Sequence, residues 1–106
     1  MADGYAPRIL KVDLTSRESE VVDIEDYKEW GGGHGMGAAL FWEMCKDKNV
    51  SGFDPGNVIT LGAGAFAGTP IPSSGRTEVT GIGPAGYPTE WYTRSNFGGR
   101  FASMLR

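Results

Sequence analysis

The stretch with the clearest chemical potential is a rigid loop of small residues that ends in an arginine, Gly68-Thr69-Pro70-Ile71-Pro72-Ser73-Ser74-Gly75-Arg76. Its two prolines fix their own φ angles and push the residues before them toward extended geometry. Small residues at 73–75 leave the backbone N–H groups open to a ligand. Arg76 adds a planar, permanently charged guanidinium that suits phosphate or carboxylate. The loop therefore predicts an anion site, and the alternative interpretation is a surface turn with a solvated arginine.

A second loop, Asn96-Phe97-Gly98-Gly99, precedes residues with helical spacing at positions 100–106. Asn96 is a good helix cap, and the N–H groups that follow it would form a second anion site. We expect Phe101, Met104 and Leu105 to share one face of this helix.

A third glycine-rich stretch runs from Gly31 to Gly37 and leads into a helix predicted over residues 36–46. Met36, Leu40 and Met44 share a face of that helix at four-residue spacing. The nominal dinucleotide fingerprint Gly33-x-Gly35-x-x-Ala38 is not favoured, because no buried strand directly precedes it. A helix N-terminus near an anion and a tight helix-packing loop both stay open.

Composition narrows the class of protein. The 106 residues carry a net charge of −3, which argues against a general nucleic-acid binder. Residues 1–56 hold six basic and eleven acidic side chains, whereas residues 57–106 hold four arginines, no lysine and two glutamates. This arginine-only basic half is what a fixed polyanionic ligand would favour. Seventeen glycines in three clusters indicate backbone packed close to a ligand or to other backbone.

Single cysteine and histidine residues exclude several kinds of site. Cys45 is alone, so the sequence offers no disulfide framework and no thiolate cluster, and we expect an inert buried thiol. His34 is also alone, so no local histidine pair can bind metal. The first five residues lack the basic and apolar regions of a signal peptide, and no apolar run is long enough to span a membrane. The cytoplasm follows as the default location, with no membrane partner.

The elements that must position these loops can be placed from residue patterns. Leu10, Val12 and Leu14 alternate with Lys11 and Asp13, which predicts a half-buried strand with the three apolar residues on its buried side. The other expected elements are a returning strand over 18–24, a helical turn over 26–30, strands over 58–61, 77–82 and 92–95, and the two helices. The order β-β-α-β-β-β-α predicts an α+β fold with mostly antiparallel strands, two short helices and one domain.

Five motifs together resemble the N-terminal domain of the tungsten-containing aldehyde:ferredoxin oxidoreductases. They are Ile9-Leu10-Lys11-Val12-Asp13-Leu14-Thr15, Gly32-Gly33-His34-Gly35-Met36-Gly37-Ala38, Asp54-Pro55-Gly56-Asn57, Gly68-Thr69-Pro70-x-Pro72-x-Ser74-Gly75-Arg76 and Ser95-Asn96-x-Gly98-Gly99. Their order and spacing match the family through nearly the whole chain.

The resemblance implies a fold and a cofactor. Residues 1–106 would form part of a β-rich, saddle-like base that carries tungsten held by the dithiolenes of two pyranopterins. The implied cofactor-binding residues are Gly75, Arg76, Ser95, Asn96, Gly98 and Gly99. Arg76 would contact the pterin and its phosphate, and the backbone carbonyl of Asn96 would bind the magnesium that bridges two phosphates.

The resemblance also implies a reaction, in which an aldehyde and water give a carboxylic acid. Two electrons pass from tungsten through a [4Fe–4S] cluster to ferredoxin. No residue of this chain is assigned a catalytic role, because the family's cluster cysteines and acid–base residues lie in later domains. The chain also departs from the family at Gly64-Ala65-Phe66-Ala67 and at His34, where the family has Gly-Pro-Leu-Thr and an arginine. We therefore expect the 106 residues alone to be inactive and to need the remainder of the oxidoreductase, in the same or a separate chain.

Two other functions remain open. The chain can be a non-catalytic binding or assembly module that self-associates, since half a domain exposes sheet edges and apolar surface. It can also bind phosphate or a nucleotide without metal, which needs only the two glycine loops and Arg76. The choice of tungsten over molybdenum and the aldehyde are not set by these residues.

Overall fold

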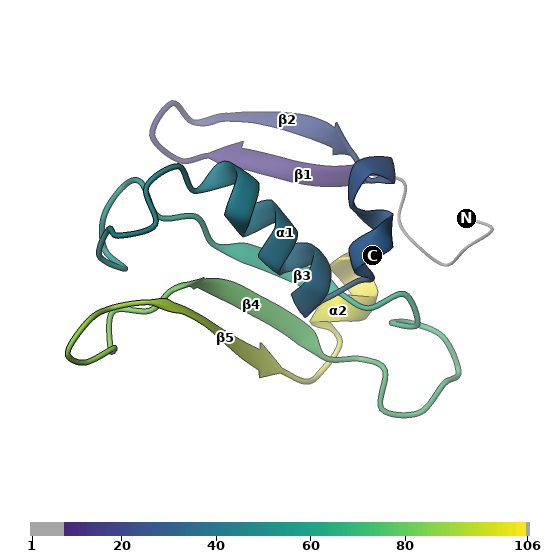
Figure 1. The fold of residues 1–106 in the computed structure, drawn as a ribbon. Helices are drawn as coiled ribbons and strands as arrows, with labels where there is room; N and C mark the ends of the chain where they lie inside the picture. Colours follow the sequence, from purple (N-terminus) through teal and green to yellow (C-terminus); the bar gives the residue numbers. More distant parts are fainter. Residues whose placement is uncertain (1–7, 106) are drawn as a thin grey trace.

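The computed structural model describes residues 8–105 and confirms an α+β fold with antiparallel strands (Figure 1). The first five residues, from which the absence of a signal peptide was expected, and Arg106 lie outside this range. The elements are β1 (Arg8–Asp13), β2 (Glu18–Asp23), the 3-10 helix η1 (Glu25–Trp30), α1 (His34–Met44), β3 (Thr60–Ala63), β4 (Thr77–Ile82), β5 (Tyr92–Phe97) and α2 (Phe101–Leu105). Strands β1 and β2 form a hairpin, and β3, β4 and β5 form a second sheet in that order.

Helix α1 lies between the hairpin and the three-stranded sheet (Figure 1). Met36 and Leu40 are buried on its hairpin side with Ile24 and Tyr27, and Met44 packs against them, which confirms the predicted apolar face. The helix begins at His34, two residues before the predicted start, because the Gly37 N–H already donates to the Gly33 carbonyl. On the sheet side, Phe41, Cys45 and Ile82 form a second buried cluster.

The hairpin faces the core with the opposite side from the one predicted. Leu10, Val12 and Leu14 are exposed by 67%, 52% and 86%, so their expected burial is wrong. Ile9 and its partner Val22 pack on the core instead. Because side chains alternate along a strand, this choice sends every even-numbered residue of β1 away from α1.

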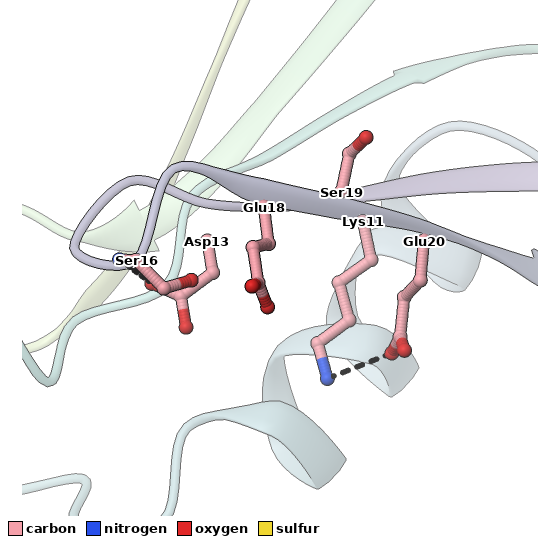
Figure 2. A pocket seen from close by; sticks show the side chains of 6 residues that line it. All are labelled: Lys11, Asp13, Ser16, Glu18, Ser19 and Glu20. Atoms are coloured by element: carbon pink, nitrogen blue, oxygen red, sulfur yellow. Dashed lines mark hydrogen bonds and ion pairs between the residues drawn. The ribbon is translucent and has the colours of Figure 1, made fainter.

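The inward side of the hairpin carries charge near its tip. Figure 2 shows Lys11, Asp13, Glu18 and Glu20 on the helix side of the ribbon, with Lys11 Nζ 3.3 Å from Glu20 Oε1. Asp13 closes the turn, because its Oδ1 accepts from the N–H groups of Thr15 and Ser16 at 2.9 and 3.3 Å. These backbone hydrogen bonds lower the pKa of Asp13.

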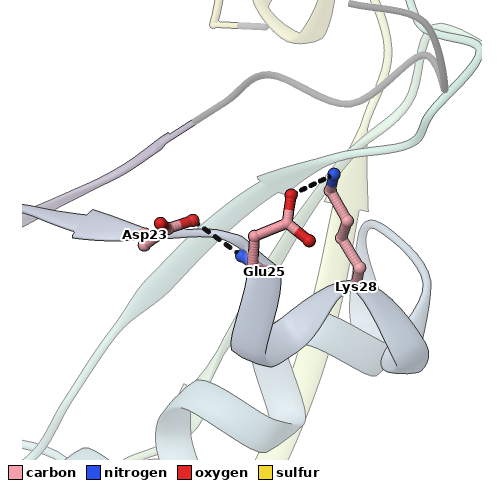
Figure 3. A network of polar contacts seen from close by, with 3 residues as sticks. All are labelled: Asp23, Glu25 and Lys28. Carbon is pink, nitrogen blue, oxygen red and sulfur yellow. Dashed lines mark hydrogen bonds and ion pairs between the residues drawn. The ribbon is translucent and has the colours of Figure 1, made fainter.

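The connection from β2 to η1 is held by local polar contacts (Figure 3). Asp23 Oδ1 accepts from the Glu25 N–H at 2.9 Å, and Lys28 Nζ lies 2.6 Å from Glu25 Oε1. The predicted helical turn over 26–30 is therefore a 3-10 helix that begins one residue earlier.

Tyr27 ties η1 to α1. Its hydroxyl donates to Glu43 Oε2 at 2.5 Å, and this hydrogen bond, with burial, raises the pKa of Tyr27 to about 12. We expect Tyr27→Phe to lower the free energy of unfolding by about 1 kcal/mol, the usual net value of one such bond. Urea denaturation of both proteins measures this, and an unchanged midpoint would show that the bond contributes nothing. Because the folded pKa is raised, the contribution is kept at neutral pH and lost only as pH rises toward 12.

Asn57 sets the start of β3 two residues later than predicted. Its side-chain amide donates to the Ile82 carbonyl at 3.1 Å and accepts from the Ile82 N–H at 3.1 Å. The backbone of Ile82 is thereby satisfied by a side chain, and regular pairing begins at Thr60 with Thr80. Nearby, the Cys45 thiol is fully buried beside the carbonyls of Asp47 and Gly56, which confirms the expected buried thiol.

Glu90 fastens the loop before Asn57 to the segment before β5. Its Oε2 accepts from the Gly52 N–H at 2.5 Å, and this bond lowers the pKa of Glu90 below its usual value of 4.5. A carboxyl with a depressed folded pKa adds stability above its unfolded pKa and loses it as pH falls through the folded value. We expect Glu90→Gln to be less stable than wild type at pH 7 and to lose less stability on acidification below pH 4.5. Thermal unfolding of both proteins at pH 7 and below pH 4.5 checks this, and an equal loss of stability in the two on acidification would contradict it.

Candidate anion-binding site

The rigid loop that ends at Arg76 and the loop after β5 meet in one hollow. Its lining residues are Ser73, Gly75, Arg76, Gly98 and Gly99, and its volume is about 280 Å³. The pairing of strands explains the meeting, because Thr77 at the start of β4 lies opposite Phe97 at the end of β5. Residues just before 77 and just after 97 must therefore leave the sheet at the same corner. Two stretches about twenty residues apart thus form one surface.

Hydroxyl groups, in addition to the two prolines, hold the first loop. Ser74 Oγ donates to the carbonyls of Phe66 and Ile71 at 2.9 and 2.7 Å. Thr69 Oγ1 donates to the Phe66 carbonyl at 2.5 Å. Ser73 has a φ of 62°, a conformation that non-glycine residues rarely adopt. The loop is pre-formed by its own hydrogen bonds, as the stiffness of its sequence predicted.

The two loops lie close to each other at their glycines. A Cβ built on Gly75 would lie 3.6 Å from the Gly99 carbonyl oxygen, and one on Gly98 would lie 3.9 Å from Arg76 Nη1. Gly99 has a φ of 95°, so a side chain there would strain the backbone. In the described part of the chain, no acceptor is found for the backbone N–H groups of residues 73–75, and no carboxylate pairs with Arg76. The hollow therefore offers uncommitted donors and one positive charge.

Helix α2 contacts both loops, but it begins at Phe101 and not directly after the predicted cap Asn96. Phe101 packs against Phe97 with ring centroids 5.5 Å apart, and Ser103 lies 3.5 Å from a Cβ built on Gly68. Ala102 is its fully buried residue, whereas Phe101, Met104 and Leu105 are exposed by 45%, 82% and 46%. With five residues, α2 is too short to present a charged N-terminus of its own.

Ser95 and Asn96 lie in β5 and do not line the hollow. Asn96 pairs with Glu78 in the sheet, so its role as a helix cap is wrong, because a strand residue cannot also begin a helix at Phe101. Ser95 pairs with Val79 and points to the opposite face of the sheet from Asn96. Of the six residues implied by the family resemblance, the structure brings together Gly75, Arg76, Gly98 and Gly99.

The strand pairing also brings together Glu78 and Arg94, two residues not predicted to belong to a site. Arg94 Nη1 lies 3.0 Å from Glu78 Oε1, and Glu78 is only 9% exposed. The sequence shows both residues but not their pairing, because a glutamate and an arginine sixteen residues apart meet only when β4 and β5 pair in this register.

His34 stands at the first position of α1 and not in the hollow. Its ring stacks on that of Tyr92 with centroids 6.1 Å apart, and the Phe41 ring packs on Tyr92 with centroids 4.8 Å apart. The His34 Nε2 and the Tyr92 hydroxyl are buried without a hydrogen-bond partner in the described range. The glycine stretch around His34 serves close packing, because a Cβ on Gly37 would lie 2.7 Å from Thr60 Oγ1.

Within residues 8–105 no cluster of three or more His, Cys, Asp or Glu side chains is placed to hold a metal ion. None of the helices in that range is long and apolar enough to cross a membrane.

Sequence comparison shows which family this chain belongs to. Residues 9–106 match the family model described as aldehyde ferredoxin oxidoreductase, N-terminal domain. A tungsten-containing aldehyde ferredoxin oxidoreductase of Pyrococcus furiosus is 29% identical over 105 residues, and one of Thermococcus kodakarensis is 30% identical over 108 residues. Each match covers 97% of this chain but 17% of the relative, so the chain spans about a sixth of the length of these relatives. The chain belongs to the family of aldehyde ferredoxin oxidoreductase N-terminal domains.

Proposed function

We propose that this chain is the cofactor-binding portion of a tungsten bis-pyranopterin oxidoreductase that oxidises aldehydes to carboxylic acids and passes electrons to ferredoxin. The observation that carries the proposal is the meeting of the Arg76 loop and the Gly98–Gly99 loop in one hollow, in a chain of this family. The names of its relatives, which are tungsten-containing enzymes, support the choice of cofactor.

The lining of the hollow fits the anionic end of such a cofactor. Arg76 would bind phosphate oxygens through its guanidinium, and open N–H groups of residues 73–75 would donate to them. Among the described residues that line the hollow there is no sulfur or imidazole, so the chain would bind and orient the organic part, whose dithiolenes hold the metal. When bound, the cofactor supplies the two-electron chemistry. The contribution of the Asn96 carbonyl to a magnesium ion between phosphates belongs to the same proposal.

The rest of the reaction would need residues outside this chain. An iron–sulfur cluster requires several thiolates. Cys45, the one cysteine in the sequence, is fully buried against backbone carbonyls. We infer that the cluster, the acid–base residues and the ferredoxin contact belong to the remainder of the oxidoreductase, in the same or a separate chain.

A second candidate function is an assembly module that self-associates, favoured by the exposed apolar residues Leu10, Val12 and Val21 on the outer side of the hairpin and Leu14 in its turn. Exposed apolar side chains gathered on one hairpin are typical of a surface that is covered by a partner.

Elemental analysis of the purified native protein, with its mass in solution, separates the two. We expect tungsten or molybdenum together with magnesium, in a complex larger than the 11.4 kDa chain. A metal-free oligomer made of this chain alone would overturn the oxidoreductase proposal and favour the assembly module.

A further inference from the structure

Strand β5 carries one side of the hollow and is hydrogen-bonded to one strand only, its neighbour β4. It is an edge strand, and from Thr93 to Phe97 its residues are exposed. Tyr92 packs on Phe41 at one end, and Phe97 packs on Phe101 at the other. Because edge strands have neighbours on one side only, the position of the Gly98–Gly99 loop depends on how firmly β5 is held to β4.

Glu78 and Arg94 add a side-chain contact to the backbone pairing of β4 with β5 in the middle of the strand. Their ion pair, 3.0 Å between Oε1 and Nη1, is the one side-chain hydrogen bond between β4 and β5 found within residues 8–105. The two partners differ in environment, because the Glu78 side chain is 11% exposed and that of Arg94 is 57% exposed. A mostly buried carboxylate needs a partner, so Glu78 constrains where Arg94 and its strand can lie.

The pair is diagonal across the ladder, which makes it sensitive to register. Glu78 lies opposite Asn96, and Arg94 lies opposite Thr80. Diagonal neighbours on one face of an antiparallel pair are within reach of long side chains. A slip of β5 by one residue would turn Arg94 to the other face and separate the charges. The same slip would move Gly98 and Gly99 away from Arg76, because the loop follows directly from the strand.

We propose that Glu78 and Arg94 are positioning residues for the anion site, which fix the register of β5 so that the Gly98–Gly99 loop closes the hollow against Arg76. This inference rests on the proposed function of the hollow as the binding site for the phosphate end of the cofactor. Neither residue lines the hollow, so both act through the strand.

If Glu78 acted on the anion site only through its charge, Glu78→Gln would have the opposite effect from the one that a positioning role predicts. Glu78→Gln removes a negative charge two residues from Arg76, which by itself strengthens the binding of an anion. Positioning predicts weaker binding, because the neutral amide holds the guanidinium less firmly. The sign of the change therefore separates the two roles.

The test is a titration of the full chain with magnesium pyrophosphate, followed through the backbone amide signals of Gly75, Gly98 and Gly99 in nitrogen-15 NMR spectra. We expect wild type to bind, and Glu78→Gln and Arg94→Gln each to bind roughly tenfold more weakly, as for partners that orient a ligating group. Arg94→Lys keeps the charge and should restore most of the affinity. The double variant should bind no more weakly than either single variant, because both remove the same contact.

Glu20→Gln is the matched control, since it makes the same charge change in the exposed Lys11–Glu20 pair of the hairpin. It should leave the affinity for magnesium pyrophosphate unchanged.

If wild type does not bind the probe, both the proposed function of the hollow and the positioning role are overturned. If wild type binds and Glu78→Gln binds equally or more tightly, the positioning role alone is overturned. If Glu78→Gln does not fold, the exposed Arg94→Gln and Arg94→Lys variants decide, and equal affinity for those two and wild type overturns the role.

Discussion

Replacement of Gly35 by alanine is expected to destabilise the fold strongly, although it adds a single methyl group. A Cβ built on Gly35 would overlap the Trp30 carbonyl oxygen and lie 3.2 Å from the Trp30 carbonyl carbon. Backbone cannot move aside as a flexible side chain can, so α1 would have to separate from η1. Overpacking of this kind costs about 1–3 kcal/mol, and occasionally more, and we expect a value near the upper end of that range.

Gly64→Ala provides the matched control for this prediction. A Cβ at Gly64 would meet nothing within 4 Å, so the same chemical change should alter stability by less than about 0.5 kcal/mol. Urea denaturation of both variants measures the difference. Equal midpoints for the two would show that the contact between α1 and η1 relaxes freely, and the packing role of the glycine stretch would then be wrong.

Replacement of Arg76 is expected to have the largest effect on ligand binding. Among the residues that the structure describes, its guanidinium is the one charged group lining the hollow and has no competing carboxylate. A hydrogen bond to a charged group contributes about 1.5–3 kcal/mol, so Arg76→Ala should weaken magnesium pyrophosphate binding by roughly tenfold to a hundredfold. Under the proposed function, the tungsten content of the native protein should fall in parallel.

Arg76→Lys tests whether the planar fork matters as well as the charge. A lysine cannot make the paired hydrogen bonds of a guanidinium, so we expect intermediate binding. Arg17→Lys is the matched change at an exposed arginine in the hairpin turn, and it should bind as wild type does. Because Arg76 is exposed, its variants should keep the unfolding midpoint of wild type. Wild-type affinity in Arg76→Ala would contradict the anion site.

The candidate site residues that the sequence located best are those in the loop that ends at Arg76, whose shape depends on its own backbone. The stiff loop that ends at Arg76 was predicted from two prolines and small residues, and the structure shows the loop closed on itself. Gly98 and Gly99 were predicted as part of a capped helix N-terminus, whereas the structure brings them to the hollow through the pairing of β5 with β4. Asn96 was misassigned as a helix cap, because its capping preference is local and its strand pairing with Glu78 is not.

The sequence by itself determined the order of elements, the antiparallel α+β class and the buried face of α1, because each follows from residue periodicity over a short window. Tertiary structure decided which side of the hairpin meets the core. Apolar residues occur on both sides of β1, and only packing against α1 selected Ile9 over Leu10. Tertiary structure also decided the meeting of the two loops and the pairing of Glu78 with Arg94, since both depend on the register between β4 and β5. Register is a relation between two strands, so no pattern within either strand contains it.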